Sequence, residues 1–408
     1  MNLPGVLFVD DEPHIIQSLR RALHSSSREW RLSFAQSGQE ALALMRRGLA
    51  QGEPIDLLVS DMRMPEMNGA ELLKQVRQEF PHTIRFVLSG HSDQDMILQT
   101  VSSAHQFLSK PCEVDLLKQC IRRAFGLRSQ LRTPEVLRLA SGVRSMPTPD
   151  RLFHEICDAL QQPRVSLEEI GEMVAQDPTV SSRILHLANS AFFGLAREVV
   201  QVPEAVVFLG IQIVKAVILS ASIFESQSQD TPKGKFVQSV QEHSLLVAGL
   251  SRHLCLSLEG SSRLAEECFI AGLLHDLGKL LLLQHSRYFP ELPLMARSQN
   301  KPLHAVESLA LGCHHGSLGG YLLGLWGLPD NVVEAVLWHH HPEQAIGTRL
   351  RPLVTVSLAN AFVSSAEPER HTREELSEEF LKTVNLHQRL DHLRTIARQF
   401  LSEARGTP

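Results

Sequence analysis

The sequence predicts two domains of different fold class: an α/β domain with a five-stranded, parallel, doubly wound sheet, followed by an all-helical domain. Short apolar runs alternate with helix-length amphipathic patterns over residues 1–125. Residues 126–147 lack this alternation and contain Pro134 and Pro147, which indicates a junction. After residue 148 the strand patterns stop and helix start signals recur. We therefore expect the second domain at 148–342, with a helical extension at 343–408.

The elements of the first domain follow from its apolar runs. The expected strands are Val6–Val9, Leu32–Ala35, Leu57–Val59, Phe86–Leu88 and Gln106–Leu108. The expected helices are Ile15–Leu23, one starting at Ala41, Glu71–Phe80, one before the fifth strand, and Val114–Phe125. Ser37 precedes Glu40 by three residues, which is the spacing of a capping box at the second helix.

The second domain shows clear helix starts. Ser166 with Glu169 forms a capping box, and Asp177 before Pro178 is a cap followed by a first-turn proline. The expected later helices are Phe236–Leu258, Ala265–Leu283, Leu303–Leu325, Asn331–His340, Arg351–Ser364, and two in the tail from Thr372.

Composition excludes several classes of protein. A hydrophobic content of 43% and a charged content of 21% over 408 residues predict globular domains with real cores. The most apolar stretch, Leu209–Phe224, contains Gln212 and Lys215 and is too short to span a membrane, and we expect no secretory signal. The six cysteines lack Cys-x-x-Cys spacing, which favours a reducing cytoplasm. A net charge of -5 argues against nucleic acid, whereas 20 histidines leave a metal site open.

Polar residues follow the expected strands of the first domain. Asp10 and Asp11 follow the first strand, Asp61 the third, Ser89 the fourth and Lys110 the fifth. The carboxyl ends of parallel strands share one edge of the sheet, so these side chains should meet there. Clustered carboxylates repel one another unless a hard cation neutralises them, and this predicts a magnesium site. The alternative is that these are solvated loop charges.

Over roughly its first 125 residues the chain resembles the receiver domain of two-component response regulators, which fill these same positions. The resemblance implies that Asp61 accepts a phosphoryl group from a sensor histidine kinase or a phosphotransfer protein. It implies that Asp10, Asp11 and Asp61 hold magnesium, and that Ser89 and Lys110 contact the phosphoryl oxygens. Phe107 would be the aromatic switch residue, acting with Ser89, and Pro111 would follow a cis peptide bond.

Helical periodicity directs several ligand-type residues of the second domain inward. His243 shares a stripe with Val240 and Val247, and Asn360 lies on an apolar face of a later helix. His304, Glu307 and His315 share a face if their helix is continuous, although Gly312 is a candidate break. Further histidines and one aspartate could converge with these on one internal site: His275, Asp276, His339 and His340.

From about residue 134 to 342 the chain resembles the HDOD family, which is related to the HD phosphohydrolases. The matching segments are Asp177-Pro178, Leu187 to Phe192, Leu209-Gly210, His275-Asp276, Gly278-Lys279, Leu325 to Pro329 and His339-His340. The related hydrolases imply metal ligands for zinc, iron or manganese at His243, His275, Asp276, His315, His339 and His340, with Lys279 near the metal. Asn360 stands where those enzymes have an aspartate, and their Gly-Tyr-Pro loop is missing.

Two functions are therefore left open. The preferred one is a phosphorelay switch that is not an enzyme, in which phosphorylation of Asp61 changes what the helical domain binds, either a downstream protein or a cyclic-nucleotide ligand. The alternative is a phosphorylation-regulated, metal-dependent phosphodiesterase acting on a cyclic nucleotide or dinucleotide. The histidines could instead be hydrogen-bonded core residues, and Asn189 and Ser190 could simply end a helix. A homodimer is also left open.

Overall fold

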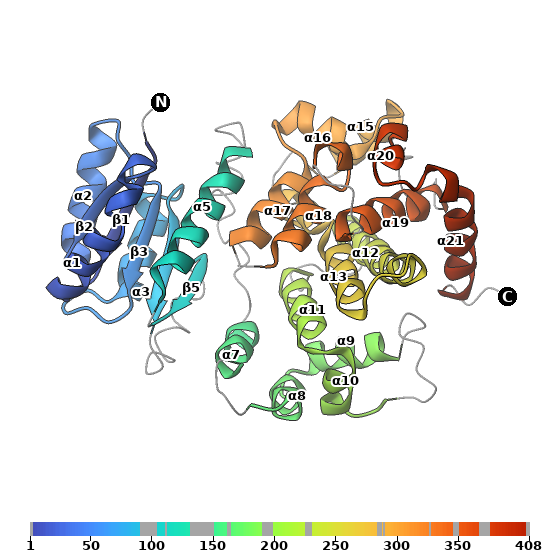
Figure 1. Cartoon of the computed structure of the whole chain (residues 1–408), viewed down its shortest axis with the longest axis horizontal. Helices are drawn as coiled ribbons and strands as arrows, with labels where there is room; N and C mark the ends of the chain where they lie inside the picture. The colour runs from blue at the N-terminus through green and yellow to red at the C-terminus, as the bar shows by residue number, and fades with distance from the viewer. Residues whose placement is uncertain are drawn as a thin grey trace. The chain divides into compact units, whose positions relative to one another are not determined.

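The computed structural model describes residues 3–89, 104–110, 112–130, 151–160, 165–189, 199–224, 231–283, 288, 290–325, 328–345, 351–366 and 376–404. They form two compact units, an α/β unit and a helical unit (Figure 1). The predicted order, an α/β domain before a helical one, is confirmed. The expected helix before the fifth strand, Pro111 and Ser190 lie outside the described residues, and the exact domain boundaries stay a prediction.

The α/β unit is built on a parallel sheet. Its strands are β1 (Gly5–Val9), β2 (Arg31–Ala35), β3 (Leu57–Asp61), β4 (Ile84–Ser89) and β5 (Gln106–Ser109). The strand order β2-β1-β3-β4-β5 places β1 beside β3, with Val9 opposite Ser60. Residues that follow β1 and β3 therefore emerge side by side. Ser89 is opposite Ser109, so the ends of β4 and β5 also coincide.

Helices cover the two faces of this sheet. They are α1 (Pro13–Ala22), α2 (Gly38–Ala50), α3 (Gly69–Glu79) and α5 (Val114–Gln130), with the 3-10 turn η1 (His24–Arg28). Buried residues of α2 and α3 share one core with Leu7 and Leu58. On the other face, Phe8 stacks on Phe34 at 5.6 Å, and the guanidinium of Arg20 in α1 lies 4.9 Å from the Phe34 ring. The strands thus alternate their side chains between two apolar layers.

Predicted helix caps are present in both units. Ser37 accepts a hydrogen bond from the Glu40 N–H, although the Glu40 carboxylate accepts from Gln36 rather than from Ser37. Ser166 and Glu169 form a reciprocal capping box. Asp177 accepts from the Val180 N–H ahead of Pro178. These caps fix where the helices begin.

The helical unit has a central bundle and a smaller group of helices beside it (Figure 1). The smaller group is α7 (Arg151–Ala159), α8 (Leu167–Ala175), α9 (Pro178–Ala188), α10 (Val202–Leu209) and α11 (Ile211–Phe224). In the bundle, α12 (Pro232–Ser257), α13 (Ser262–Leu274) and α19 (Pro352–Ala366) pack on one another, with α18 (Asp330–Trp338) and α21 (Leu390–Ala404) against them. The remaining elements are α14 (Leu277–Leu282), α15 (Glu291–Ser298), α16 (Leu303–Leu311), α17 (His315–Leu325), η2 (Pro342–Gln344), α20 (Glu378–Thr383) and η3 (His387–Arg389).

Two of the predicted helices are wrong in their continuity. The expected helix Ala265–Leu283 is two helices, α13 and α14, which meet at His275 and Asp276. The expected helix Leu303–Leu325 is α16 and α17, because Gly312 adopts a left-handed φ of 76° that ends α16. Both breaks fall where ligand-type residues stand, so they place those residues at helix ends rather than on a continuous face.

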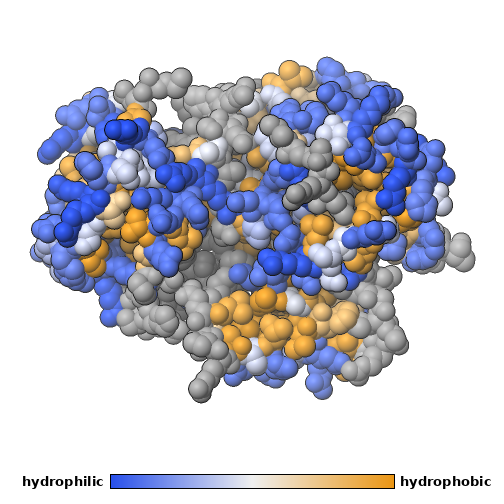
Figure 2. All heavy atoms as spheres, in the orientation of Figure 1, coloured by the Kyte–Doolittle hydropathy of each residue, from blue (hydrophilic) through white to orange (hydrophobic). Residues whose placement is uncertain are grey.

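Helices α10 and α11 form the most apolar part of the described chain. Within the residues described, no single helix is long and apolar enough to cross a membrane, although α10 and the start of α11, bent by 109°, pass the criterion as a pair. In Figure 2, apolar side chains gather on the surface around α9, α10 and α11. Val200, Val207 and Phe208 are exposed there.

Candidate functional sites

The first candidate site lies at the carboxyl edge of the sheet. Asp10 and Asp11 follow β1, Asp61 ends β3, and Lys110 follows β5. One carboxylate oxygen of each aspartate lies within 4.8 Å of the other two. The Lys110 Nζ lies 2.9 Å from Asp10 Oδ2 and 2.6 Å from Asp61 Oδ1. The structure therefore brings together the four charged residues that the sequence singled out.

Burial controls the charges at this carboxylate site. Desolvation raises the pKa of Asp61 above its ordinary value, and Lys110 only partly offsets this. Burial also opposes the charged form of Lys110, but its hydrogen bonds to Asp61 and Asp10 prevail and raise its pKa. Three carboxylates thus face a single ammonium group. The oxygen-only donor set and the uncompensated negative charge fit Mg²⁺.

The turn after β3 is tightly built. The Gly69 N–H donates to the Met62 carbonyl at 2.9 Å, and a Cβ atom at Gly69 would overlap the Asp61 carbonyl oxygen. Glycine is therefore required for α3 to start so close to the acidic residue. Ser89 ends β4 opposite Ser109, and Phe107 lies opposite Val87, so their backbones are adjacent to the Lys110 strand end. The side chains of Ser89 and Phe107 lie outside the described residues.

The second candidate site is a buried group of side chains in the helical unit, which we call the central cluster. It contains one aspartate and five histidines from four places in the chain: His243 (α12), His275 and Asp276 (between α13 and α14), His315 (α17), and His339 and His340 (after α18). The ligand atoms of His243, His275 and Asp276 lie within 4.8 Å of one another, and so do those of His315, His339 and His340. All six predicted ligand positions are thus brought together.

Backbone and carboxylate acceptors fix the orientation of three of these imidazoles. The Nδ1 atoms of His275, His339 and His315 lie 2.7 Å from Gly272 O, 2.8 Å from Val336 O and 2.6 Å from Glu307 Oε2, respectively. The Nε2 atoms of His275 and His339 are buried, and within the part of the chain that the structure describes they have no hydrogen-bond partner. An unpaired buried nitrogen is costly, so these lone pairs fit a transition metal.

Asp276 is the charged centre of this cluster. Its Oδ2 lies 2.6 Å from Lys279 Nζ, and its Oδ1 lies 3.1 Å from His315 Nε2. Burial alone would raise the pKa of Asp276, but His275, Lys279 and His315 hold it well below the ordinary value. Glycine is again required nearby, because a Cβ atom at Gly278 would overlap the His315 carbonyl.

The imidazoles of the cluster differ in protonation. Burial lowers the pKa of His275 and lowers that of His339 and His340 well below the ordinary value, so these rings are neutral. Burial also opposes protonation of His315, but Glu307 and Asp276 outweigh it and raise its pKa to about 9. A divalent transition metal requires neutral imidazoles and an ionised carboxylate, so His315 must lose a proton before it can bind the metal, whereas the other three rings are already neutral.

At position 360 the sequence has an asparagine where a second carboxylate was expected. It is buried in α19, as predicted, and its Oδ1 lies 2.9 Å from His243 Nε2. This contact occupies the His243 nitrogen that faces the cluster. The amide oxygen of Asn360 carries no negative charge. The donor atoms therefore fit an ion bound by His275, Asp276, His315, His339 and His340 better than an ion bound by His243.

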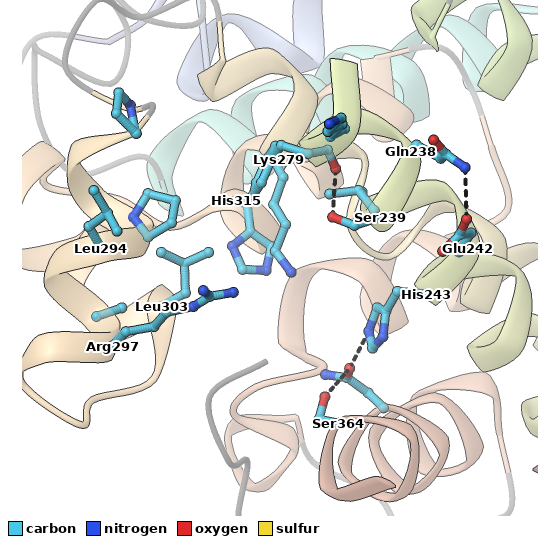
Figure 3. Close-up of a pocket in the computed structure, with 17 residues that line it drawn as sticks. Gln238, Ser239, Glu242, His243, Lys279, Leu294, Arg297, Leu303, His315 and Ser364 are labelled. Carbon is cyan, nitrogen blue, oxygen red and sulfur yellow. Dashed lines mark hydrogen bonds between the residues drawn. The ribbon is translucent and has the colours of Figure 1, made fainter. Parts of the chain in front are cut away.

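Two cavities border the central cluster. One of about 510 Å³ is lined by His243, Lys279, His315 and Asn360. Figure 3 shows His315 and Lys279 between Leu294, Leu303 and Arg297 on one side and His243 with Ser364 on the other. A second cavity of about 620 Å³ is lined by His339 and His340. The cluster can therefore be reached by small molecules from two cavities.

Some contributing residues were not identified as site residues from the sequence. Glu307 was expected to face inward and to accept hydrogen bonds from the histidines if these are core residues. Its buried carboxylate accepts from both the His315 N–H and the Tyr288 hydroxyl, at 2.9 and 2.8 Å. Tyr288 carries no sequence signal, because nothing in its spacing relates it to α16. Asn189 exchanges two hydrogen bonds with the Val199 backbone, which supports its expected role at a helix end.

Comparison with known families identifies both units. The model of the response regulator receiver domain matches residues 6–122. The HDOD domain model matches residues 146–342. The chain therefore carries a receiver domain of the response regulator type, followed by an HDOD domain.

Several proteins resemble parts of the chain. A Treponema pallidum protein is 25% identical over 231 residues, covering 55% of this chain and 43% of its own length. The hydrogenase transcriptional regulatory protein HoxA of Cupriavidus necator is 31% identical over 185 residues, covering 42% of this chain and 37% of its own length. The match thus spans less than half the length of these curated relatives.

Two solved structures resemble the two units. The receiver domain of an HD domain-containing protein from Pseudomonas fluorescens Pf-5 is 31% identical, covering 31% of this chain and 96% of that chain, with a TM-score of 0.28. An HDOD domain protein of unknown function from Geobacter sulfurreducens is 18% identical, covering 70% of this chain and 99% of that chain, with a TM-score of 0.46.

Proposed function

We propose that this response regulator is switched by phosphorylation of Asp61 and that the switch controls what its HDOD domain binds, either a downstream protein or a cyclic-nucleotide ligand. The observation that supports this most directly is the position of Lys110 Nζ, 2.9 Å from Asp10 and 2.6 Å from Asp61. A cation and a group of carboxylates at one edge are what phosphoryl transfer to a carboxylate requires. The donor would be a sensor histidine kinase or a phosphotransfer protein.

The chemical step assigns a role to each residue of the carboxylate site. An Asp61 oxygen attacks the phosphorus, the bond from phosphorus to the donor imidazole breaks, and that imidazole takes up a proton as it leaves. Magnesium held by Asp10, Asp11 and Asp61 would supply positive charge to the transferring oxygens. Lys110 contacts one of these oxygens, and Ser89, at the end of β4, contacts another. Phe107, in β5, is the switch residue that responds to phosphorylation of Asp61.

Acyl phosphate formation provides the test. The full chain, incubated with acetyl phosphate and Mg²⁺, should gain one phosphoryl group by intact mass, and Asp61→Asn should gain none. Asp115→Asn is the matched control, because Asp115 is an exposed carboxylate on α5 whose side chain is 91% accessible. A chain that takes up no phosphoryl group, or an Asp61→Asn variant that labels normally, would contradict the proposal.

The unpartnered nitrogens of His275 and His339 favour a second candidate function, a metal centre in the HDOD domain. A zinc, iron or manganese ion bound by His275, Asp276, His315, His339 and His340, with His243 nearby, would supply an activated water for attack on a phosphoester. Lys279 would orient an anionic substrate from the adjoining cavity, such as a cyclic nucleotide or dinucleotide. Asn360 weakens this candidate, because it replaces a charged ligand.

Metal content separates the two candidates. Elemental analysis should find a transition metal that His275→Ala and Asp276→Ala remove and that His387→Ala retains. Turnover of a cyclic dinucleotide would then establish a hydrolase, and bound metal without turnover would leave a binding or sensing site. The homodimer and the cytoplasmic location stay predictions.

A further inference from the structure

Three histidines outside the central cluster form a group of their own, which we call the outer trio. His304 is in the first turn of α16, His314 directly precedes α17, and His341 follows α18. The ring centres of His304 and His341 are 5.2 Å apart, and each lies 6.2 Å from that of His314. The three ring planes are steeply inclined to one another, at 90°, 73° and 68°.

These distances and angles suit a shared metal ion better than they suit stacking. Two imidazoles bound to one tetrahedral ion at about 2.0 Å hold their ring centres roughly 5 Å apart. Parallel stacking, by contrast, occurs between His304 and His340, at 4.0 Å and 24°. Among the described residues, the groups of three ligand atoms within 4.8 Å of one another do not include the outer trio, so an ion bound there would draw its three rings closer together.

Each ring of the trio retains a nitrogen that could bind metal. The Nδ1 of His341 lies 3.3 Å from Glu343 Oε1, and the Nε2 of His314 lies 3.0 Å from Ser317 Oγ. The Nδ1 atoms of His304 and His314 are buried and have no hydrogen-bond partner among the described residues. A buried nitrogen that makes no hydrogen bond is costly, so each of these two atoms favours a bound ion. Glu343 beside His341 is the carboxylate–histidine pairing that orients metal ligands.

The surroundings allow an ion to reach the trio. His304, His341 and Glu343 line the cavity of about 620 Å³, together with Lys301. The His341 side chain is 38% accessible, so this side of the trio is open to solvent. An all-imidazole donor set binds Zn²⁺, Cu²⁺ or Ni²⁺ and discriminates against Mg²⁺.

We propose that His304, His314 and His341 form a second transition-metal site of the HDOD domain, separate from the central cluster, that holds a Zn²⁺-type ion. Its fourth position faces the cavity and is open to water or to a ligand atom from solution. Glu343 is a positioning residue that fixes the His341 ring.

Cobalt(II) titration of the full chain tests this site, because tetrahedral Co²⁺ has visible absorption bands that report nitrogen ligation. When Co²⁺ is added to metal-depleted protein, the His341→Ala variant should bind one equivalent less than the unaltered chain. Glu343→Gln should lower the affinity for that ion by about 10–100-fold. His387→Ala, an exposed histidine of η3, should bind as the unaltered chain does. His341 is partly exposed, so the fold should survive its replacement, and circular dichroism checks this.

Asp276→Asn distinguishes the outer trio from the central cluster. The proposal requires that an ion lost on His341→Ala is retained on Asp276→Asn. It is overturned if His341→Ala binds as many ions, with the same spectrum, as the unaltered chain, or if both substitutions remove the same ion. Neither result depends on phosphorylation of Asp61, so the proposed switch is judged separately.

Discussion

The carboxylate site of the receiver domain and the central cluster of the HDOD domain share one contact and differ in almost everything else. In each, a lysine Nζ lies 2.6 Å from a buried aspartate: Lys110 from Asp61, and Lys279 from Asp276. Yet the pKa of Asp61 is raised, mainly by burial, whereas that of Asp276 is held well below its ordinary value in spite of burial. The same ion pair therefore has opposite consequences in its two settings.

The number of positive groups around each aspartate explains the difference. Asp61 shares Lys110 with Asp10, so the carboxylates outnumber the cations and a divalent ion is needed. Asp276 has Lys279 to itself and shares a protonated His315 with Glu307, so two positive groups balance two carboxylates. Any metal in the central cluster is therefore bound for its nitrogen ligands rather than for charge compensation. Five predictions test this contrast.

The largest effect is expected for Asp276→Asn. The substitution leaves Lys279 without its carboxylate and leaves His315 with Glu307 alone, and removal of one partner from such a buried network costs about 3–5 kcal/mol. Urea unfolding of the metal-free chain should show this loss in the HDOD transition. Asp61→Asn should instead stabilise the Mg²⁺-free receiver slightly, because it removes a charge that burial disfavours. Equal losses in both variants would refute the contrast.

Replacement of the two lysines should separate chemistry from stability. Lys110→Met should slow labelling by acetyl phosphate about 100-fold or more, because a fixed cation at the transferring oxygens is lost. Lys279→Met should leave the labelling rate unchanged and lower only the stability of the HDOD domain. Labelling time courses by intact mass measure the first effect, and a normal rate in Lys110→Met would remove this lysine from the mechanism.

Acid should destabilise the receiver domain through His105. This buried ring accepts the Arg85 N–H at 2.9 Å, and burial with the Arg85 charge lowers its pKa well below 6.5. A lowered pKa gives stability that is present above pH 6.5 and is lost as the pH falls below it, by about 1.4 kcal/mol per pH unit. Hydrogen exchange of receiver peptides between pH 7 and pH 5 should show this dependence, and His105→Gln should abolish it.

The stability of the HDOD domain should fall both at high pH and at low pH. His315, with a pKa of about 9, contributes stability that is present below pH 6.5 and lost as the pH rises through about 9. His304 and His314 have pKa values of about 3, mainly because they are buried, and contribute stability that is lost below pH 6.5. An HDOD domain that weakened only in acid would show that His315 is not protonated.

The smallest effect is expected for Asn360→Asp. A carboxylate beside His243 adds a charged ligand, so the affinity of the central cluster for Zn²⁺ should rise roughly tenfold, within the range that metal-site carboxylates contribute. Without metal the same substitution should destabilise the HDOD domain, because it buries a second negative charge near Asp276. Competition with a chelating dye measures the affinity, and Asn360→Gln is the uncharged control.

How far the sequence predicted these sites depends on the type of secondary structure that supplies the residues. Side chains that follow parallel strands must emerge at one edge, so Asp10, Asp61 and Lys110 could be assembled from their order alone. No such rule relates the ends of different helices. The sequence showed that His243 and Asn360 face inward and left open that they converge with His275 and His339. Only resemblance to a family gave the histidines as ligand positions.

The sequence by itself determined the two fold classes, the strands, most helices and the residues of the carboxylate site, because each of these depends on local periodicity and one rule of sheet topology. The tertiary structure alone decided that Asp276 pairs with Lys279, that Tyr288 donates to Glu307, and that His304 meets His341. These contacts depend on helix packing and on two helix breaks, and the side chains that meet carry no mark of their partners in the linear chain.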